Sequence, residues 1–303
     1  MTAEKSISIY IPTYNRPDFL DRALASVERQ TYKNLQVLIC DDGSDKNYEE
    51  IYEKYKNSFS DLILLRNESS RGACHSRNRM IQIADGEYIT GLDDDDEFLP
   101  DRIETFVQAK ELSEYAYLCA GQLTKTKTGI YRQPHQPGKI ELSHLFNRNY
   151  VGNQVFVKTE AFRMINGFDE SLPAWQDYDA WVRLTQSIGS GFKLPCHTYQ
   201  LNIDHEEGRI STSPKAKMGY ELFLQRYDCF LSKGNRSSLF FQDKINRNQN
   251  ISLQELFNNY SSNTLKMFVK HTINKRFPLL KSILYKHKNE GKNGKNQSAT
   301  YFR

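Results

Sequence analysis

The sequence of 303 residues lacks several features that would assign it to a familiar class. No run approaches the ~18 apolar residues that a membrane span needs, and Ser6–Ile11 at the start is typical of a strand, not of a secretory signal. There is no Gly-x-Gly-x-x-Gly and no Gly-x-x-x-x-Gly-Lys motif, which disfavours a dinucleotide fold and a P-loop. The five cysteines form no Cys-x-x-Cys pair, which favours reduced thiols in a cytoplasmic protein over zinc or disulfides. They are Cys40, Cys74, Cys119, Cys196 and Cys229.

Positive charge is concentrated at the C-terminal end. The net charge is +4, but the segment from Ile251 onward holds ten lysines and arginines against two glutamates, so this segment carries +8 and the preceding body −4. Apolar residues recur at helical spacing among these lysines. That pattern suits a helix on an anionic membrane surface, and it also suits a helix docked on its own domain or on a partner. We expect the last residues, about 288–303, to be disordered. We expect no nucleic-acid partner. The sequence indicates no oligomeric state.

Strands and helices are predicted to alternate four times in the first hundred residues. Apolar runs predict strands at Ile7–Ile11, Leu35–Cys40, Leu62–Leu65 and Tyr88–Leu92, and a segment with helical spacing lies next to each of them. Short connections between alternating elements predict a parallel sheet with helices on both faces. Further strands are expected at Tyr115–Leu123, at Val155–Val157 and from Tyr199, with a loop or hairpin between Lys125 and Gly138.

Polar clusters follow each of the first four strands. They are Thr13-Tyr14-Asn15, Asp41-Asp42, Arg71-Gly72 and Asp93-Asp94-Asp95-Asp96. In a parallel sheet these ends meet at one rim, which is where ligands bind. Four adjacent carboxylates suit a divalent cation, Mg²⁺ or Mn²⁺, although a solvated acidic turn would give the same pattern. With such a cation the predicted ligand is a nucleoside diphosphate, with Tyr14 stacking on its base and Asp42 accepting a hydrogen bond from it.

Three further residues each have two interpretations. Arg77 would either balance the acidic rim through an ion pair or contact the nucleotide. Asp177 stands where a helix is predicted to begin, so spacing alone favours a helix N-cap over a chemical role. His205, in a polar loop, is either a surface residue or a ligand that completes a metal site beside the aspartates.

Six motifs resemble, in order and spacing, the family 2 glycosyltransferases of the GT-A fold. They are Ile-Pro-Thr-Tyr-Asn-Arg (11–16), Cys-Asp-Asp-Gly-Ser (40–44), Arg-Gly-Ala-Cys-His-Ser-Arg-Asn (71–78), Leu-Asp-Asp-Asp-Asp (92–96), Gly-Phe-Asp-Glu (167–170) and Gln-Asp-Tyr-Asp-Ala-Trp-Val-Arg-Leu (176–184). The resemblance implies an α/β catalytic domain over residues 1–212, with a Rossmann-like, mostly parallel sheet. Residues 1–99 would be its nucleotide-binding half, residues 100–212 its acceptor half, and residues 213–303 a helical, basic extension.

The resemblance also implies a role for each site residue. The donor nucleotide would contact Thr13, Tyr14, Arg16, Asp42, Arg77, Asp93 and Asp94. Mn²⁺ or Mg²⁺ would bind Asp95, with Asp93 and His205 as further ligands, and Asp177 would be the catalytic base. The family usually has Glu-Asp where this chain has Gln176-Asp177, and a small residue where it has Asp94.

The implied activity is inverting transfer of a sugar from a nucleotide-diphospho-sugar, expected to be a UDP-sugar. The acceptor would be a hydroxyl of a glycan or a lipid-linked saccharide, in bacterial surface polysaccharide (O-antigen or capsule) synthesis at the cytoplasmic face of the membrane. Two other classes remain open: a metal-dependent sugar nucleotidyltransferase, which would release pyrophosphate, and a non-catalytic, membrane-recruited nucleotide-binding module. The unbroken series of rim motifs argues against the second.

Overall fold

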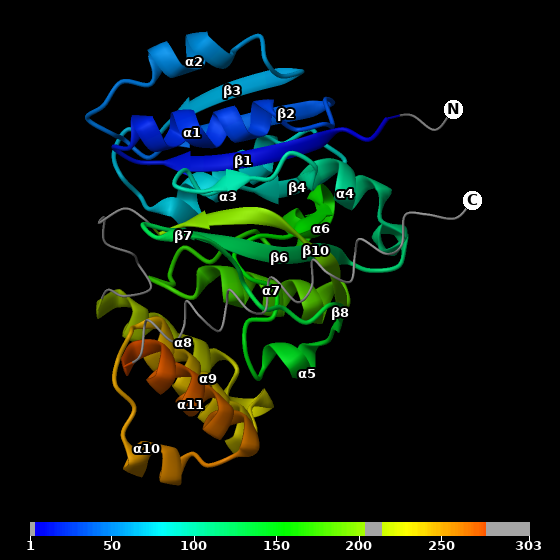
Figure 1. The fold of residues 1–303 in the computed structure, drawn as a ribbon. Helices are drawn as coiled ribbons and strands as arrows, with labels where there is room; N and C mark the ends of the chain where they lie inside the picture. Colours follow the sequence, from blue (N-terminus) through cyan, green and yellow to red (C-terminus); the bar gives the residue numbers. More distant parts are fainter. Residues whose placement is uncertain (1–3, 204–213, 277–303) are drawn as a thin grey trace, which may run out of the picture. The chain divides into compact units, whose positions relative to one another are not determined.

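The computed structural model describes residues 4–203 and 214–276 of the chain. By compactness the chain divides into two units, Met1–Tyr227 and Asp228–Arg303. The first unit holds a sheet with its helices, and the second is helical (Figure 1). The expected domain boundary after residue 212 stays a prediction. His205 and the expected disordered end, about 288–303, lie outside the described residues.

The first ninety residues form the predicted alternation of strands and helices. These elements are β1 (Ile7–Thr13), α1 (Pro17–Glu28), β2 (Leu35–Asp41), α2 (Glu49–Tyr55), β3 (Asp61–Arg66), α3 (Ala73–Ile83) and β4 (Tyr88–Gly91). Proline at the first position of α1 suits a helix start, because its fixed φ is helical and its missing N–H is not needed there. Every residue of β1 and β2 is buried, as expected for parallel strands covered on both faces.

The rest of the first unit adds shorter strands and the helices beside them. These are β5 (Glu97–Phe98), α4 (Arg102–Gln108), the 3₁₀ turn η1 (Lys110–Ser113), β6 (Tyr117–Thr126), β7 (Gly129–Arg132), β8 (Gly138–Ile140), α5 (Leu142–Leu145), β9 (Phe156–Lys158), α6 (Thr159–Met164), α7 (Gln176–Ser187), β10 (Gly191–Asn202) and α8 (Pro214–Arg226). Strand β7 pairs antiparallel with β6, which confirms a hairpin between Lys125 and Gly138. Strand β10 begins well before the expected Tyr199, because Pro195 obscures the strand pattern and register shifts accommodate it.

The sheet has the order β3-β2-β1-β4-β9-β6-β10-β5 (Figure 1). Strands β1 to β4 run parallel, β6 and β10 run parallel to each other, and β9 is antiparallel to both β4 and β6. The predicted, mostly parallel α/β sheet is therefore confirmed. Its geometry places the carboxyl ends of β1, β2, β3 and β4 at one edge, where the polar clusters lie.

Both faces of the sheet are covered by helices. Ile9 and Ile11 of β1 pack in a core cluster with Leu20 and Leu24 of α1. Tyr10 points to the opposite face, because side chains alternate along a strand, and its ring lies 6.2 Å from that of Phe168. Helix α3 packs on β1 and β2, and α6 on β9.

The second unit contains η3 (Asp228–Phe230), α9 (Lys233–Asn246), α10 (Leu253–Asn258) and α11 (Ser262–Arg276). Ser232 and Ser252 begin α9 and α10 as N-caps of full capping boxes. Helix α11 packs on α9 and on α10. No helix in the described ranges combines the length and the apolar content needed to cross a membrane.

Candidate active site

The aspartate run after β4 is mostly buried. Asp94 and Asp96 are each 1% exposed, whereas the side chains of Asp93 and Asp95 are 24% and 22% exposed. The interpretation of the run as a solvated acidic turn is therefore wrong. The exposure alternates along the run: the carboxylates of Asp93 and Asp95 are partly exposed at the rim, and those of Asp94 and Asp96 are buried.

Asp94 holds the loop after β1. Its carboxylate accepts a hydrogen bond from the Thr13 hydroxyl at 2.8 Å and pairs with the Arg16 guanidinium at 2.8 Å. The same guanidinium lies 3.3 Å from a carboxylate oxygen of Asp95. Burial raises the pKa of Asp94 to about 7 in spite of the arginine. Arg16 thus joins a buried aspartate to a rim aspartate.

Asp96 and the backbone of Asp95 attach the run to neighbouring elements. The Asp96 carboxylate accepts hydrogen bonds from the Tyr199 hydroxyl at 2.9 Å and the Asn202 backbone N–H at 2.8 Å. The carbonyl of Asp95 accepts from Arg22 and from the Asn202 side chain. These bonds fix the turn, so the positions of the two rim carboxylates are set by buried contacts.

Asp177 lies in the first turn of α7 and does not cap it. The N-cap position belongs to Trp175, which has a left-handed backbone conformation with φ 65° and makes no side-chain cap bond. The expectation from spacing that Asp177 is an N-cap is therefore wrong. Its buried Oδ1 accepts no hydrogen bond among the described residues. Desolvation by burial, opposed by Arg77, raises the pKa of Asp177 to about 6.

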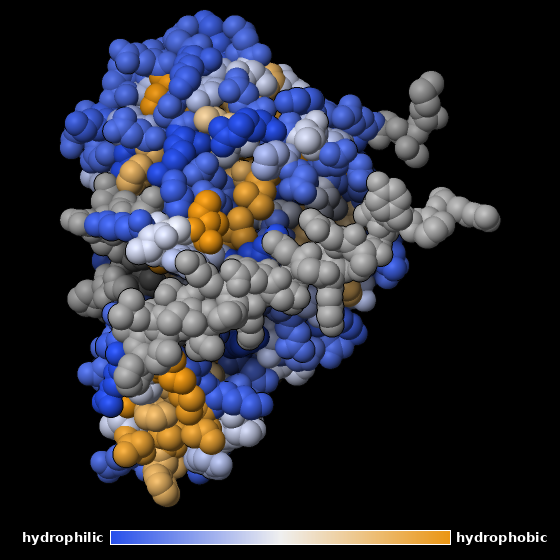
Figure 2. All heavy atoms as spheres, in the orientation of Figure 1, coloured by the Kyte–Doolittle hydropathy of each residue, from blue (hydrophilic) through white to orange (hydrophobic). Residues whose placement is uncertain are grey.

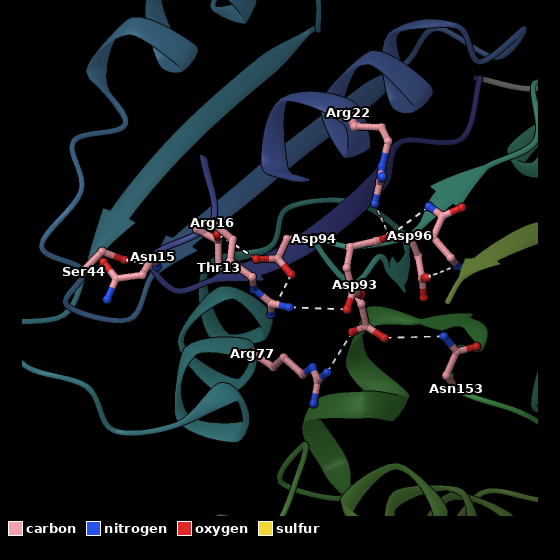
Figure 3. Close-up of polar contacts among 12 residues, drawn as sticks. Thr13, Asn15, Arg16, Arg22, Ser44, Arg77, Asp93, Asp94, Asp96 and Asn153 are labelled. Atoms are coloured by element: carbon pink, nitrogen blue, oxygen red, sulfur yellow. Dashed lines mark hydrogen bonds and ion pairs between the residues drawn. The ribbon is translucent and has the colours of Figure 1, made fainter. Parts of the chain in front are cut away.

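Arg77 of α3 lies between Asp93 and Asp177. Its guanidinium is 2.8 Å from Asp93 Oδ1, a contact drawn in Figure 3. It is also 3.7 Å from Asp177 Oδ1 and lies over the Phe168 ring at 5.2 Å. Burial alone would lower the pKa of Arg77, but the two carboxylates raise it above its usual value, so the cation is permanent. The ion-pair interpretation of Arg77 is confirmed. One buried arginine therefore connects the aspartate run to α7.

Two residues that sequence reasoning missed also hold Asp93. The side-chain amides of Asn153 and Gln154 each lie 3.4 Å from an Asp93 carboxylate oxygen. Gln154 also accepts a hydrogen bond from the buried Tyr10 hydroxyl at 2.9 Å. They lie in an irregular segment before β9 and carry no motif, so nothing local in the sequence could have found them.

Tyr14 and Asp42 lie in different environments at the rim. Tyr14 is 44% exposed, which leaves its ring accessible to a ligand. Asp42 is 4% exposed, and its two oxygens already accept hydrogen bonds from protein donors. These donors belong to Asn67, Ser70, Arg71, Gly72 and Ser76. Burial alone would raise the pKa of Asp42, but these bonds hold it below its usual value. Asp42 therefore orders the loop before α3, and a base would have to displace one of its donors.

The rim carboxylates fit a divalent cation that takes part of its shell from a ligand. Within the described residues, no group of three His, Cys, Asp or Glu side chains is arranged to hold a metal ion. Mg²⁺ and Mn²⁺ do not need such a cage, because they commonly bind one or two carboxylates together with substrate phosphates. Asp93 and Asp95 are partly exposed, are two residues apart and carry hard oxygen ligands, so they fit that role. The proposed third ligand, His205, lies outside the described residues.

A buried charge network supports α7 behind Asp177. Asp179 is fully buried and accepts hydrogen bonds from Arg183 at 2.7 Å, Arg226 at 2.7 Å and the Tyr227 hydroxyl at 2.8 Å. Arg183 also donates to the Gly167 carbonyl. The network ties α7 to α8 and to the Gly-Phe-Asp-Glu turn, so it fixes the start of the helix that carries Asp177.

Comparisons with known proteins show the family to which the chain is related. The family model described as Glycosyl transferase family 2 matches residues 8–168. The putative colanic acid biosynthesis glycosyl transferase WcaA of Escherichia coli strain K12 is 35% identical over 260 residues, which cover 82% of this chain and 91% of the relative. The UDP-Glc:alpha-D-GlcNAc-diphosphoundecaprenol beta-1,3-glucosyltransferase WfgD of Escherichia coli is 26% identical over 201 residues, which cover 65% of this chain and 77% of WfgD.

The fold is also similar to that of a solved structure. The crystal structure of S. aureus TarS 1-349 in complex with UDP-GlcNAc superposes with a TM-score of 0.64 at 16% identity, covering 88% of this chain and 79% of that one. This likeness confirms the predicted GT-A fold, and the family match confirms the predicted relationship. The chain belongs to glycosyltransferase family 2.

Proposed function

We propose that the protein transfers a sugar from a nucleotide-diphospho-sugar to a hydroxyl group of a glycan or lipid-linked acceptor, with inversion at the anomeric carbon. The observation that carries the proposal is the arrangement of Asp177, Arg77 and Asp93. A carboxylate whose buried oxygen accepts no hydrogen bond among the described residues lies across one arginine from a carboxylate at the rim. In such an arrangement a proton acceptor and a diphosphate site are neighbours, and the arginine separates them.

Asp177 is the general base in this mechanism. It takes the proton from the acceptor hydroxyl while the hydroxyl oxygen forms a bond to the anomeric carbon and the carbon–oxygen bond to the diphosphate breaks. The electron pair of the broken bond leaves with the nucleoside diphosphate. A pKa of about 6 suits this role, because the carboxylate is mostly ionised at pH 7 and still basic enough to accept a proton. One displacement inverts the centre, so an α-linked donor gives a β-linked product.

Mn²⁺ or Mg²⁺, held by Asp95 and Asp93 with His205 as a further candidate, would neutralise charge on the departing diphosphate. Arg16 and Arg77 remain beside these carboxylates and supply fixed positive charge to the same region. Asn153 and Gln154 orient Asp93. These residues therefore act on the leaving group, whereas Asp177 acts on the attacking oxygen.

The donor nucleotide is expected at the ends of β1 and β2. The exposed ring of Tyr14 is available to stack on a base. Thr13 and Asp94 are buried and hydrogen-bonded to each other, Asp94 also pairs with Arg16, and Asp42 orders the neighbouring loop. A UDP-sugar is the expected donor, which is consistent with the UDP-GlcNAc named in the TarS complex and the UDP-Glc named for WfgD.

The proposed setting is the synthesis of a bacterial surface polysaccharide at the cytoplasmic face of the membrane. WcaA is named for colanic acid biosynthesis, and the name of WfgD gives a diphosphoundecaprenol-linked saccharide as its acceptor. An acceptor of that kind is held in a membrane, so its glycosyltransferase must work at the membrane surface.

A screen of nucleotide-sugars with the purified protein tests the proposal. The protein should release a nucleoside diphosphate from a UDP-sugar in the presence of Mn²⁺ or Mg²⁺, and EDTA should abolish the release. Full activity in EDTA would contradict the role of the metal. Release of pyrophosphate from a nucleoside triphosphate and a sugar phosphate would contradict sugar transfer and identify a nucleotidyltransferase instead.

A further inference from the structure

Helices α10 and α11 present an apolar surface that stays exposed among the described residues. Twelve large hydrophobic side chains are exposed among the described residues, and five of them fall between positions 253 and 269. These five are Leu253, Phe257, Tyr260, Leu265 and Val269. Phe257 is 85% exposed and Leu253 is 71% exposed. Figure 2 shows hydrophobic surface gathered over these two helices, and we call the five residues the α10–α11 patch.

The opposite side of the two helices is already packed. Leu256, Thr264 and His271 are buried, and α11 contacts α9. The His271 ring nitrogen lies 2.7 Å from the carbonyl of Gln249, which anchors α11 to the segment before α10. The helices therefore have a core-facing side of their own, and the α10–α11 patch is a second apolar face.

The charge around the patch is positive. Between positions 251 and 276 the chain has four cationic residues, Lys266, Lys270, Lys275 and Arg276, and one acid, Glu255. Glu255 pairs with Lys244 at 2.6 Å and caps the start of α10, so its charge is neutralised within the unit. An anionic surface complements this side of the protein.

We propose that the α10–α11 patch inserts into the interfacial layer of an anionic lipid membrane. Leucine and phenylalanine suit the boundary between head groups and acyl chains, and tyrosine suits the head-group layer, where its ring and hydroxyl are both accommodated. Lysines beside them face anionic head groups. The helices lie on the membrane and do not cross it. The proposal goes beyond sugar transfer and is tested separately, because vesicle binding requires no donor.

The apolar contribution is tested in the full chain with the double variant Leu253→Ser/Phe257→Ser. The measurement is cosedimentation with vesicles of phosphatidylcholine and phosphatidylglycerol. Wild-type protein should bind, and the variant should need about tenfold more lipid or more for half-maximal binding, since two apolar side chains no longer insert. Met164→Ser removes a side chain that is 72% exposed in the first unit and should bind as wild type does. Equal binding of wild type and the double variant would overturn the proposal.

The electrostatic contribution is tested with Lys266→Gln. This variant should bind phosphatidylglycerol vesicles several-fold more weakly, at about 1 kcal/mol per lysine near the surface. Lys158→Gln, on β9, removes an equal charge from the first unit and should leave binding unchanged. Binding that is equally strong to pure phosphatidylcholine vesicles would overturn the proposed preference for anionic lipid. No binding of the wild type to anionic vesicles would overturn membrane insertion and leave a protein or another part of the chain as the occupant of the patch.

Discussion

Replacing Arg77 by glutamine should raise the pH at which the enzyme becomes active. As the proposed general base, Asp177 must be ionised to accept a proton, so kcat/KM of the wild type should fall about tenfold per pH unit below its pKa of about 6. Arg77 favours the ionised form, because its guanidinium lies 3.7 Å from Asp177 Oδ1. Removing that cation disfavours the charged carboxylate, so the pKa of Asp177 rises.

The size of the shift follows from the contacts of Arg77. Two unit charges 3.7 Å apart interact with about 4 kcal/mol at an effective dielectric constant of ~20, which corresponds to roughly three pKa units. Asp93 shares the guanidinium at 2.8 Å, and solvent reaches Asp177, whose side chain is 29% exposed. The sharing of the guanidinium and the contact with solvent reduce the expected rise in the pKa of Asp177 to about one or two units. Asp93 loses its counter-ion in the variant and repels Asp177, which shifts the pKa in the same direction.

The assay is the pH profile of nucleoside diphosphate release between pH 5 and 9, under kcat/KM conditions. Arg77→Lys keeps the charge and should keep the midpoint near that of the wild type. Arg79→Gln removes a charge from another face of α3, where Arg79 donates to the Arg66 carbonyl, and should not move the midpoint. A midpoint that stays the same or falls in Arg77→Gln would refute the reasoning.

Three further predictions concern other parts of the same machinery. Arg16→Gln removes the contact between Arg16 and Asp95, so Mn²⁺ should bind about two- to fivefold more tightly in calorimetry without donor; weaker binding would contradict competition between this arginine and the cation. The folded-state pKa of Asp94, about 7, lies above its ordinary value of 3.8, so stability tied to the protonated carboxyl is lost as the pH rises through 7. The difference in Tm between Asp94→Asn and wild type should therefore change in favour of the variant as the pH is raised from 5 to 8. A difference in Tm that is the same at every pH would refute this. Asp179→Ala leaves Arg183 and Arg226 without their carboxylate and should lower the free energy of unfolding by about 3 kcal/mol, read from urea denaturation. A loss as small as that of Asp228→Ala, whose ion pair is exposed, would contradict a structural role for the network.

The arrangement of the sheet could be predicted from the sequence because its signals are local. Apolar runs such as Leu35–Cys40 end in turn residues, and alternation with helices dictates parallel strands and a common rim. The convergence of Thr13, Asp42 and the aspartate run follows from that topology alone. Strand β10 was harder to place, since Pro195 interrupts its pattern and only pairing with β6 restores it.

The different roles of the four aspartates in the run could not be predicted from the sequence. All four residues are chemically identical, and their roles depend on partners distant in sequence: Arg16 for Asp94, and β10 for Asp96. Asp177 shows the same limit, because spacing favours a cap and only the backbone of Trp175 shows that the cap position is already taken. Tertiary contacts decide which carboxylates point inward.

The basic C-terminal region shows a further limit. Up to residue 276 its helical spacing correctly predicts helices, yet one periodic pattern contains two faces. Leu256 is buried while Phe257, the next residue, is 85% exposed. Hydrophobic spacing alone does not indicate which of them meets the protein core.

The most direct test of the account is the activity of Asp177→Asn with a donor and acceptor that the wild type uses. The variant should bind the nucleotide-sugar as tightly as wild type, since Asp177 acts on the acceptor hydroxyl, and its sugar transfer should fall about 10²- to 10⁴-fold, the usual contribution of a general base. Transfer at the wild-type rate by a folded Asp177→Asn protein would contradict the central claim that this aspartate is the catalytic base.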